Sequence, residues 1–405
     1  MSVIDNEVYE NPSYIGEDLK EELFVQTDLP IEFEVDSKVL IEAFNVCSKI
    51  IPTSSHVPLL QCIKFEVFKE NLFITAMNTD QSVMQIVPVS NMSGGNGSYL
   101  FPAKEGMELI KRLPAGKLKL SRHENLVSVF YGTKNKKTTL RVLSSEEFPK
   151  LPSLQSKEIY QIPIAVLLRG TQAAKFAAND TNRPILNGIN IAQLGDKLVF
   201  MATDTHRFFR YVSPIQASDS EPFRSITVPA EIFSKFVEQV GKYTQVLEMF
   251  VSGERLILRS DSFVFFCSLL EGTYPDLNRL LTQTNEGESV QVQLAEFTEV
   301  LYQSLSVKKT DHKITLSGSP SQNLSFHSVS ENMEIYEEFD TSSVSEEFES
   351  INFNGEFIYE ALTLLNKAKV ANLQVANLQI TGSLKPTFVT FPDEPDILMG
   401  LMPIR

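Results

Sequence analysis

Alternating apolar and polar residues, followed at once by an amphipathic helix pattern, recur along this chain. A period of two predicts a strand with one buried face, and a period near 3.6 predicts a helix. The first step of this kind begins at Ile31, Tyr160 and Val290, and a second begins at Ser98, Ser225 and Ser350. The sequence therefore predicts three copies of one module, about 130 residues apart, each made of two half-units.

Each predicted half-unit holds one helix and several strands, which is too little structure to cover its own apolar face. We therefore expect two half-units to pack together in an α+β domain that occurs three times. Polar, proline-containing linkers at Glu146–Glu158 and Glu271–Ser289 occupy equivalent places at the ends of the first two copies. The expected organisation is an acidic N-terminal extension over 1–30, followed by domains over 31–155, 156–283 and 284–405.

Composition places the chain among globular proteins, since 42% of its 405 residues are hydrophobic and 21% are charged. No apolar run approaches the ~20 residues that span a bilayer, and the N-terminus lacks a basic and then apolar leader. Cys47, Cys62 and Cys267 are widely spaced among apolar residues, which favours buried thiols in a reducing compartment over a disulfide framework or a zinc site. We expect a cytoplasmic protein with no membrane partner.

The net charge of −15 would argue against a nucleic-acid partner if it were evenly spread. By segment, however, the net charge is −7 over 1–30, +3 over 31–155, 0 over 156–283 and −11 over 284–405. A fold that gathered the basic residues on one surface could therefore still hold DNA. The N-terminal extension is typical of a disordered tail; the alternative is an acidic segment that competes with DNA for a basic surface.

Signals of catalysis are few. The sequence contains no phosphate-binding loop, no dinucleotide fingerprint, no nucleophile elbow and no zinc-protease motif. Only the stretch Thr203–Arg207 resembles a site, because Asp204 precedes His206 by two residues and such a pair can ligate a metal or orient a base. The alternative is a hydrogen-bonded turn or part of a binding surface. No cofactor is expected, and a binding protein is favoured over an enzyme.

Basic residues fall on the predicted helices of every half-unit. One such residue alone is typical of a solvated helix face or a helix C-terminus. Taken together, they would line a common surface that attracts phosphates without reading sequence. The candidates for DNA contact are Lys38, Lys49, Lys104, Lys111, Arg112, Arg169, Lys175, Lys235, Lys242, Lys308, Lys309 and Lys367.

The repeated module carries sequence tags that resemble the bacterial DNA polymerase III beta subunit, the sliding clamp. The tags are SSHVPLL (54–60), EEFPKLP (146–152), NRPILNGI (182–189), MATDTHRF (201–208), EGTYPDLNRLL (271–281), FNGEFIYEALTLL (353–365), TGSLKP (381–386) and LMPIR (401–405). Each tag alone is weak, but eight in order across a threefold repeat are specific. The resemblance covers about Ile31 to Arg405.

This resemblance implies the DNA clamp fold, in which two copies join head to tail in a ring with helices facing the hole and sheets outside. It implies a processivity factor without catalytic activity of its own, which encircles duplex DNA independently of sequence. The implied partners are a second copy of the chain, the replicative polymerase, the clamp loader and other proteins that carry clamp-binding peptides.

The resemblance also implies a pocket for a short apolar peptide, with aliphatic walls and a few polar groups at the rim. By motif position it involves Arg183, Leu186, Thr203, Thr205, His206, Arg207, Phe208, Pro275, Arg279, Leu280, Met402, Pro403, Ile404 and Arg405. Internal ion pairs are the alternative for the arginines 183 and 207, and core packing is the alternative for residues 186, 280 and 402.

Two residues depart from the family pattern inside this pocket. Thr205 stands where the family usually has Gly, and Phe208 where it usually has a smaller aliphatic residue, so a narrower pocket is expected. For ring closure, the family pairs an edge strand of the first domain with the third domain. That pairing implies an edge near Lys137–Val142 that contains Leu140, and a partner surface near Leu301 and Leu305.

Two other functions compete with the sliding clamp. One is an interaction scaffold that keeps the peptide pocket but does not encircle DNA, which the −11 balance of residues 284–405 would suit. The other is a metal-dependent DNA-processing enzyme that uses Asp204 and His206, although no further carboxylate lies near that motif. Retention on closed circular DNA separates the first alternative from a clamp.

Overall fold

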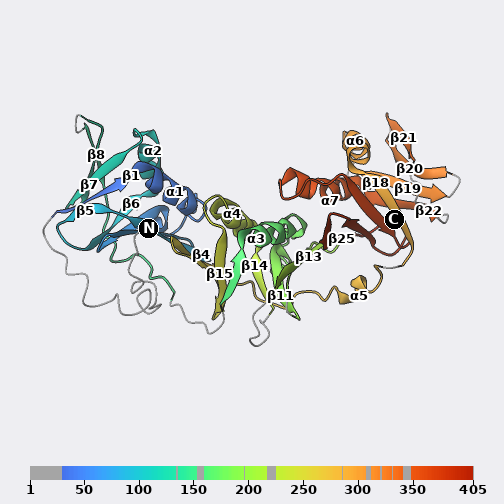
Figure 1. The fold of residues 1–405 in the computed structure, drawn as a ribbon, viewed down its shortest axis with the longest axis horizontal. Helices are drawn as coiled ribbons and strands as arrows, with labels where there is room; N and C mark the ends of the chain where they lie inside the picture. The colour runs from blue at the N-terminus through green and yellow to red at the C-terminus, as the bar shows by residue number, and fades with distance from the viewer. Residues whose placement is uncertain are drawn as a thin grey trace. The chain divides into compact units, whose positions relative to one another are not determined.

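The computed structural model describes residues 30–133, 136–152, 159–195, 197–216, 225–284, 286–306, 312–319, 322–330, 332–340 and 348–404. The chain forms two compact units (Figure 1). Unit 1 comprises the residues up to Ile164 together with Lys235–Leu269, and unit 2 comprises Ala165–Ser234 together with Leu270–Arg405. The expected N-terminal extension lies outside the described residues except for Pro30, as do Lys308, Lys309 and Arg405.

Unit 1 contains two antiparallel sheets. The five-stranded sheet has the order β5 (Ser90–Ser93), β1 (Ile31–Asp36), β7 (Lys117–His123), β8 (Leu126–Tyr131) and β9 (Lys136–Arg141). The eight-stranded sheet has the order β10 (Tyr160–Pro163), β15 (Val246–Ser252), β16 (Arg255–Ser260), β17 (Phe263–Ser268), β4 (Gln81–Pro88), β3 (Asn71–Met77), β2 (Cys62–Phe68) and β6 (Gly97–Pro102).

Unit 2 repeats this plan. Its eight-stranded sheet has the order β14 (Ile226–Pro229), β11 (Gly188–Leu194), β12 (Lys197–Thr203), β13 (Arg207–Gln216), β25 (Glu394–Leu401), β24 (Thr387–Phe391), β23 (Val375–Ile380) and β18 (Glu288–Gln293). Its four-stranded sheet has the order β21 (Glu334–Phe339), β20 (Gln322–Val329), β19 (Lys313–Ser319) and β22 (Phe348–Asn354).

All six predicted strand-to-helix steps occur in the structure. Strands β1, β6, β10, β14, β18 and β22 lead directly into α1 (Ser37–Cys47), α2 (Ala103–Arg112), α3 (Ile164–Gly170), α4 (Ala230–Val240), α6 (Leu294–Ser304) and α7 (Gly355–Lys367). Polar residues fix two of these starts: Asp36 accepts a hydrogen bond from the Lys38 amide, and Asn354 accepts one from the Glu356 amide. Asp and Asn are preferred helix N-caps because their oxygens satisfy free backbone donors.

Backbone pairing continues across the expected domain boundaries. Strand β17, from the second repeat, pairs with β4 from the first, with Phe265 opposite Val83. Strand β13, also from the second repeat, pairs with β25 from the third, with Phe209 opposite Met399. The central repeat therefore contributes strands to both units, and the two-unit division does not follow the three expected domains. The three-domain organisation stays a prediction.

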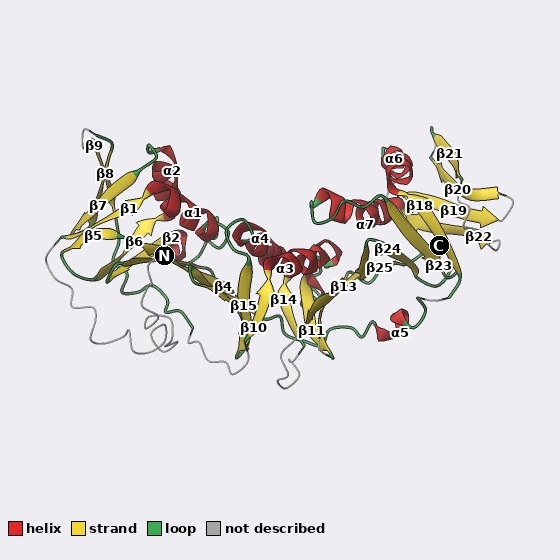
Figure 2. Cartoon of the chain, in the orientation of Figure 1, coloured by secondary structure: helices red, strands yellow, loops and turns green. Residues whose placement is uncertain are grey.

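Different elements pack on the two faces of the large sheet of unit 2 (Figure 2). On one face, Phe209 contacts Phe176 of the short helix η5 (Thr171–Phe176), with 5.7 Å between ring centroids. On the opposite face, Phe208 packs with Phe388 and with Leu277, which immediately precedes α5 (Asn278–Leu281). Alternate residues of β13 thus serve two packing layers, as the pleat of a strand requires.

Within the described ranges, none of the helices combines the length and the apolar character that crossing a membrane requires.

Gly400 leaves room for the ring of Phe208. The two residues are opposite each other on β25 and β13, and a Cβ atom at position 400 would lie 2.1 Å from the Phe208 ring. We predict that Gly400→Val lowers the free energy of unfolding by about 1–3 kcal/mol through overpacking. Adding Phe208→Leu should recover most of the loss, because the smaller side chain frees the volume. Urea unfolding of both variants checks this, and equal stability of the single and double variants would contradict it.

Candidate functional site

The turn between β12 and β13 is held by its own side chains. Asp204 Oδ1 accepts hydrogen bonds from the backbone amides of His206 and Arg207, each at 3.0 Å, while Oδ2 accepts from Arg207 Nε at 2.9 Å. Thr205 adopts φ +78°, in the left-handed region that favours glycine. Both carboxylate oxygens of Asp204 are thus engaged, and no cluster of three metal-ligating side chains occurs in the described part of the chain. The structure shows a hydrogen-bonded turn at these residues.

Tyr274 anchors this turn to the linker that follows β17. Its hydroxyl accepts a hydrogen bond of 2.9 Å from the Thr203 amide, and burial raises the pKa of the phenol. The Thr203 side chain is buried and donates to the Arg207 carbonyl at 2.7 Å. Thr203 therefore stabilises the turn through its hydrogen bonds and leaves only 5% of its surface exposed.

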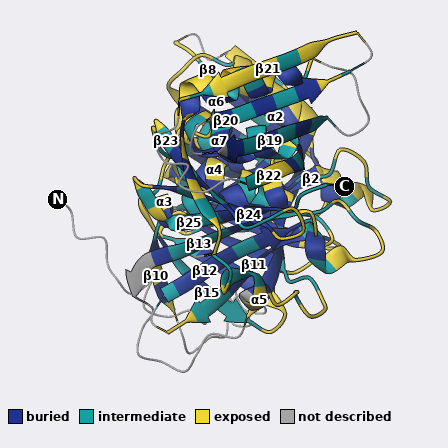
Figure 3. Ribbon diagram, turned by 90° about the vertical axis from the view of Figure 1, so that its right-hand side faces the viewer, coloured by how far each residue is buried: buried dark blue, intermediate teal, exposed yellow. Residues whose placement is uncertain are grey.

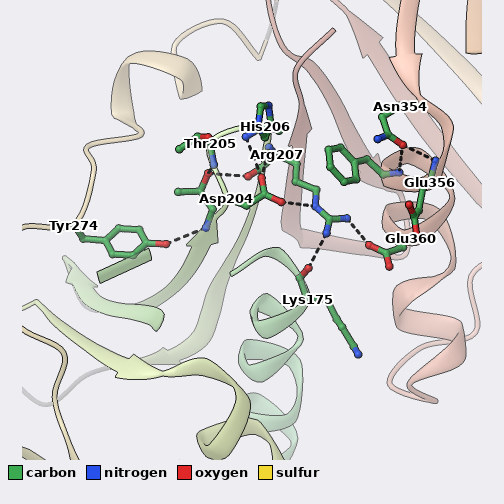
Figure 4. Close-up of polar contacts among 11 residues, drawn as sticks. Lys175, Asp204, Thr205, His206, Arg207, Tyr274, Asn354, Glu356 and Glu360 are labelled. Atoms are coloured by element: carbon green, nitrogen blue, oxygen red, sulfur yellow. Dashed lines mark hydrogen bonds and ion pairs between the residues drawn. The ribbon is translucent and has the colours of Figure 1, made fainter. Parts of the chain in front are cut away.

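Arg207 is the most heavily engaged residue of the turn (Figure 4). Its guanidinium forms ion pairs with Asp204 and with Glu360 of α7, and it donates to the Lys175 carbonyl at 3.1 Å. Aromatic rings of Phe176 and Phe357 cover its faces, with centroids at 5.0 and 4.3 Å. The side chain is only 10% exposed. For Arg207, the internal ion pairs of the alternative are therefore present, and most of its guanidinium is covered within the protein.

The C-terminal segment runs beside this turn. The Met402 amide donates to the His206 carbonyl and the Ile404 amide to the Asn352 carbonyl, each at 2.8 Å. Met402, Pro403 and Ile404 are half-buried, and His206 is exposed with its ring 6.4 Å from that of Phe357. Residues 203–208 and 402–404, which are far apart in the sequence, therefore lie together as the motif positions imply.

An apolar cluster lies next to the turn, on the face of the large sheet of unit 2 that is opposite η5. We call it the α5 cluster. Its buried members are Phe208, Leu277 and Phe388, and its half-buried members are Met201, Leu280, Leu281 and Leu398. Because four members keep part of their surface in solvent, this cluster can still bury apolar area against a ligand.

The remaining expected pocket residues divide by exposure. Pro275 and Arg279 are exposed, and Arg183 is exposed with an ion pair of 3.3 Å to Asp180. Leu186 is only 1% exposed, within the short helix η6 (Pro184–Asn187). Core packing is therefore confirmed for Leu186, and the expectation that it forms an accessible wall is corrected.

Ten of the twelve expected DNA-contacting residues are described, and eight of these are exposed lysines. These are Lys38, Lys49, Lys104, Lys111, Lys175, Lys235, Lys242 and Lys367. Arg112 is exposed and pairs with Glu108 at 3.3 Å. Arg169 is different: it donates to both carboxylate oxygens of Glu394, at 2.9 and 3.2 Å, and this bonding raises its pKa. Because its charge is matched inside the protein, we remove Arg169 from the DNA-contacting set.

The three residues expected at a subunit interface differ in accessibility. Leu140 is half-buried on β9, an edge strand, and lies opposite the buried Val127. Leu305 is half-buried at the C-cap of α6. Leu301 is 0% exposed and packs in the core, which corrects the expectation that it contacts a partner. Helical periodicity explains the error, because residues 297, 301 and 304 form the buried face of α6.

Sequence reasoning missed several residues that build this region. Glu360 and Phe357 complete the surroundings of Arg207 from 150 or more positions away, and nothing local signals that contact. Leu277 and Leu281 could have been found, since the linker sequence YPDLNRLL spaces its leucines as one side of a helical turn would.

Comparison with known proteins agrees with this architecture. The sequence model of the DNA polymerase III beta subunit, N-terminal domain, matches residues 31–152, and that of its central domain matches residues 161–276. The beta sliding clamp of Bacillus subtilis is 21% identical over 385 residues, which cover 93% of this chain and all of the relative.

Solved structures resemble the chain over the same length. The beta chain of Streptococcus pneumoniae DNA polymerase III has a TM-score of 0.83 at 22% identity, covering 93% of this chain and 100% of that one. A Pseudomonas aeruginosa sliding clamp bound to griselimycin has a TM-score of 0.82 at 19% identity, covering 93% and 99%. The fold is that of a DNA clamp. The chain belongs to the DNA polymerase III beta subunit family, the beta sliding clamps, as a divergent member.

The position of Arg207 leads to a stability prediction. Replacing it with Met keeps a long side chain between the two rings but leaves Asp204 and Glu360 without their cation, so we expect a loss of about 3 kcal/mol in the free energy of unfolding. The matched control is Arg183→Met, which removes an exposed ion pair and should cost less than about 1 kcal/mol. Urea unfolding compares the two variants. Equal losses would mean that Arg207 does not hold the turn to α7.

Proposed function

We infer that this chain is a DNA polymerase processivity factor, a clamp that encircles duplex DNA and holds a polymerase on its template. One observation carries the inference: the resemblance to the beta sliding clamps extends over 93% of the chain and includes the matching fold. Such a protein acts by enclosure and binding, so it needs no nucleophile and no cofactor. The compartment that this function implies is the cytoplasm, where bacterial DNA is replicated.

We propose that the exposed lysines on the helices contact DNA phosphates. Support comes from their distribution, since α1, α2, α4 and α7 and the short helix η5 each carry at least one exposed lysine. Contacts to phosphate carry no sequence information, as a clamp that moves along any template requires. Lys308 and Lys309 remain in the proposed set on sequence alone.

We propose that the replicative polymerase, the clamp loader and other partners dock short apolar peptides on the α5 cluster and the adjoining turn. Supporting features are the half-buried members of the cluster, the exposed residues Thr205, His206, Pro275 and Arg279, and the neighbouring C-terminal segment. The Pseudomonas aeruginosa clamp of similar fold is bound to griselimycin, which makes that compound a useful probe for this chain.

We further propose a homodimer in which β9 of one copy pairs with β21 of the other. Both strands lie at the edge of a sheet in the described part of the chain, so each leaves one side of its backbone available for pairing. Figure 3 shows β21 exposed along most of its length. Strand β9 reads KKTTLR and β21 reads EIYEEF, so the two edges carry opposite charge.

The spacing of these charges favours one register. Lys137 and Arg141 lie four residues apart on one face of β9, and Glu334 and Glu338 lie four apart on one face of β21. Antiparallel pairing that sets Lys137 opposite Glu338 also sets Arg141 opposite Glu334. Opposite charges directly across a pair of strands stabilise the pairing.

A topological assay tests the proposed function. Linear duplex DNA is incubated with the protein, ligated into a circle, and passed over a sizing column in about 0.5 M salt, above the range in which phosphate contacts hold a protein on DNA. We expect the protein to elute with the closed circle and to be released when a single restriction cut opens it. Loss from the intact circle would contradict encirclement and favour an interaction scaffold.

Charge reversal tests the dimer. We predict that Lys137→Glu with Arg141→Glu shifts the sedimenting species from twice 45.5 kDa to 45.5 kDa, since facing like charges cost several kcal/mol. Adding Glu334→Lys and Glu338→Lys should restore the dimer by exchanging the signs. Lys104→Glu with Lys111→Glu on α2 is the control and should stay dimeric. Leu140→Asp is a less specific variant, because Leu140 also faces the core. A dimer that survives the first double reversal would eliminate this pairing.

A further inference from the structure

Arg210 lies at the border of the α5 cluster. It follows Phe208 by two residues on β13, so both side chains project from the same face of the sheet. Its two neighbours across the sheet are Met201 on β12 and Leu398 on β25, and both belong to the cluster. Directly paired residues of antiparallel strands have adjacent side chains on one face. The guanidinium of Arg210 is therefore carried beside apolar side chains that are partly open to solvent.

No internal partner balances this charge in the described residues. Arg210 is half-buried, and no ion pair or hydrogen bond of its side chain occurs with any described residue, although Asp396 lies on the same face two residues before Leu398. Burial without a compensating carboxylate lowers the pKa of Arg210 from its usual value. An arginine nevertheless stays charged at neutral pH, because its pKa is so high.

Three of the four other half-buried arginines in the described residues form ion pairs with carboxylates. In unit 1, Arg259 lies on β16 beside the apolar residues Phe250 and Val264, and it forms an ion pair with Glu248 directly across the sheet. Arg169 and Arg207 in unit 2 also hold carboxylates. The fourth, Arg122, lies over the Tyr99 ring and donates to the backbone carbonyl of Glu124. Arg210 has neither a carboxylate nor a carbonyl partner among the described residues.

We propose that Arg210 receives its carboxylate from the docked partner, so that this site selects peptides carrying an Asp or Glu beside their apolar residues. The proposal rests on peptide docking at the α5 cluster and adds a chemical requirement to it. A guanidinium can donate two parallel hydrogen bonds to one carboxylate, and partial burial strengthens such bonds. Phe208 fills the inner part of the cluster, which leaves the selection to groups at its border.

Two panels of synthetic peptides test the requirement. Each peptide has eight residues, labelled with fluorescein, and contains two leucines separated by one serine in a background of Gly and Ser. One panel carries a single Glu, placed in turn at each non-leucine position, and the other carries Gln at the same positions. Fluorescence polarisation measures the dissociation constant of every peptide, and circular dichroism verifies that each protein variant is folded.

On the unsubstituted protein, at least one Glu peptide should bind about 10-fold more tightly than its Gln counterpart, as expected for a charged hydrogen bond. Arg210→Gln should abolish this preference while the affinities of the Gln peptides stay within about twofold. Arg112→Gln, on the exposed surface of α2, is the matched control and should keep the preference. Arg210→Glu should invert it, so that Gln peptides bind better.

The outcomes distinguish a failure of the Arg210 proposal from a failure of the peptide-docking site. If both panels bind and Glu and Gln peptides bind equally well, Arg210 does not read an acidic group, although the docking site stands. The same conclusion follows if the Glu preference survives in Arg210→Gln. If neither panel binds and griselimycin does not bind either, the docking site itself is wrong and the role of Arg210 falls with it.

Discussion

Antiparallel pairing between strands of successive repeats is the interaction on which the rest of this structure depends. The pairs β4 with β17 and β13 with β25 join separate modules through backbone hydrogen bonds, which any side chain allows. Only the alternation of side chains between the two faces must be kept. This explains how the fold is retained at 22% identity, with a TM-score of 0.82 to the Bacillus subtilis clamp.

Each eight-stranded sheet carries an apolar cluster where strands of two repeats pair. The two clusters differ in how far their residues are buried. In unit 1, the cluster contains five buried residues, on which the half-buried residues Phe73 and, from the linker, Leu151 pack. The buried residues are Met84, Phe250, Ile257, Val264 and Phe266. In unit 2, the corresponding linker supplies α5, and four of the seven members of the α5 cluster remain partly exposed. The same architecture therefore leaves less apolar surface in solvent in unit 1 than in unit 2, where we propose that peptides dock.

Structural features that depend on the spacing of neighbouring residues could be predicted from the sequence. The six strand-to-helix steps follow from alternation and amphipathic spacing, and the caps at Asp36 and Asn354 are local as well. Partners far along the chain were not predictable. Arg169 looked like a surface cation because Glu394 is 225 residues away, and Arg207 looked like a rim residue because Glu360 is 153 residues away. Leu186 and Leu301 were expected at accessible surfaces but are buried. A position in a sequence motif determines neither how deeply a side chain is buried nor which face of its element it lies on.

The charge of this chain is consistent with a weak but enclosing hold on DNA. Each phosphate neutralised by a lysine adds about one unit to the dependence of log affinity on log salt, so a protein with many such contacts binds tightly and moves poorly. Here the exposed lysines are divided among several helices, and acidic residues such as Glu105, Glu108, Glu231 and Glu356 lie on the same helices. Interspersed acids reduce the attraction at any one point. In the proposed clamp, retention on DNA then comes from topology, so the stability of the proposed subunit interface, rather than affinity for phosphate, sets the residence time.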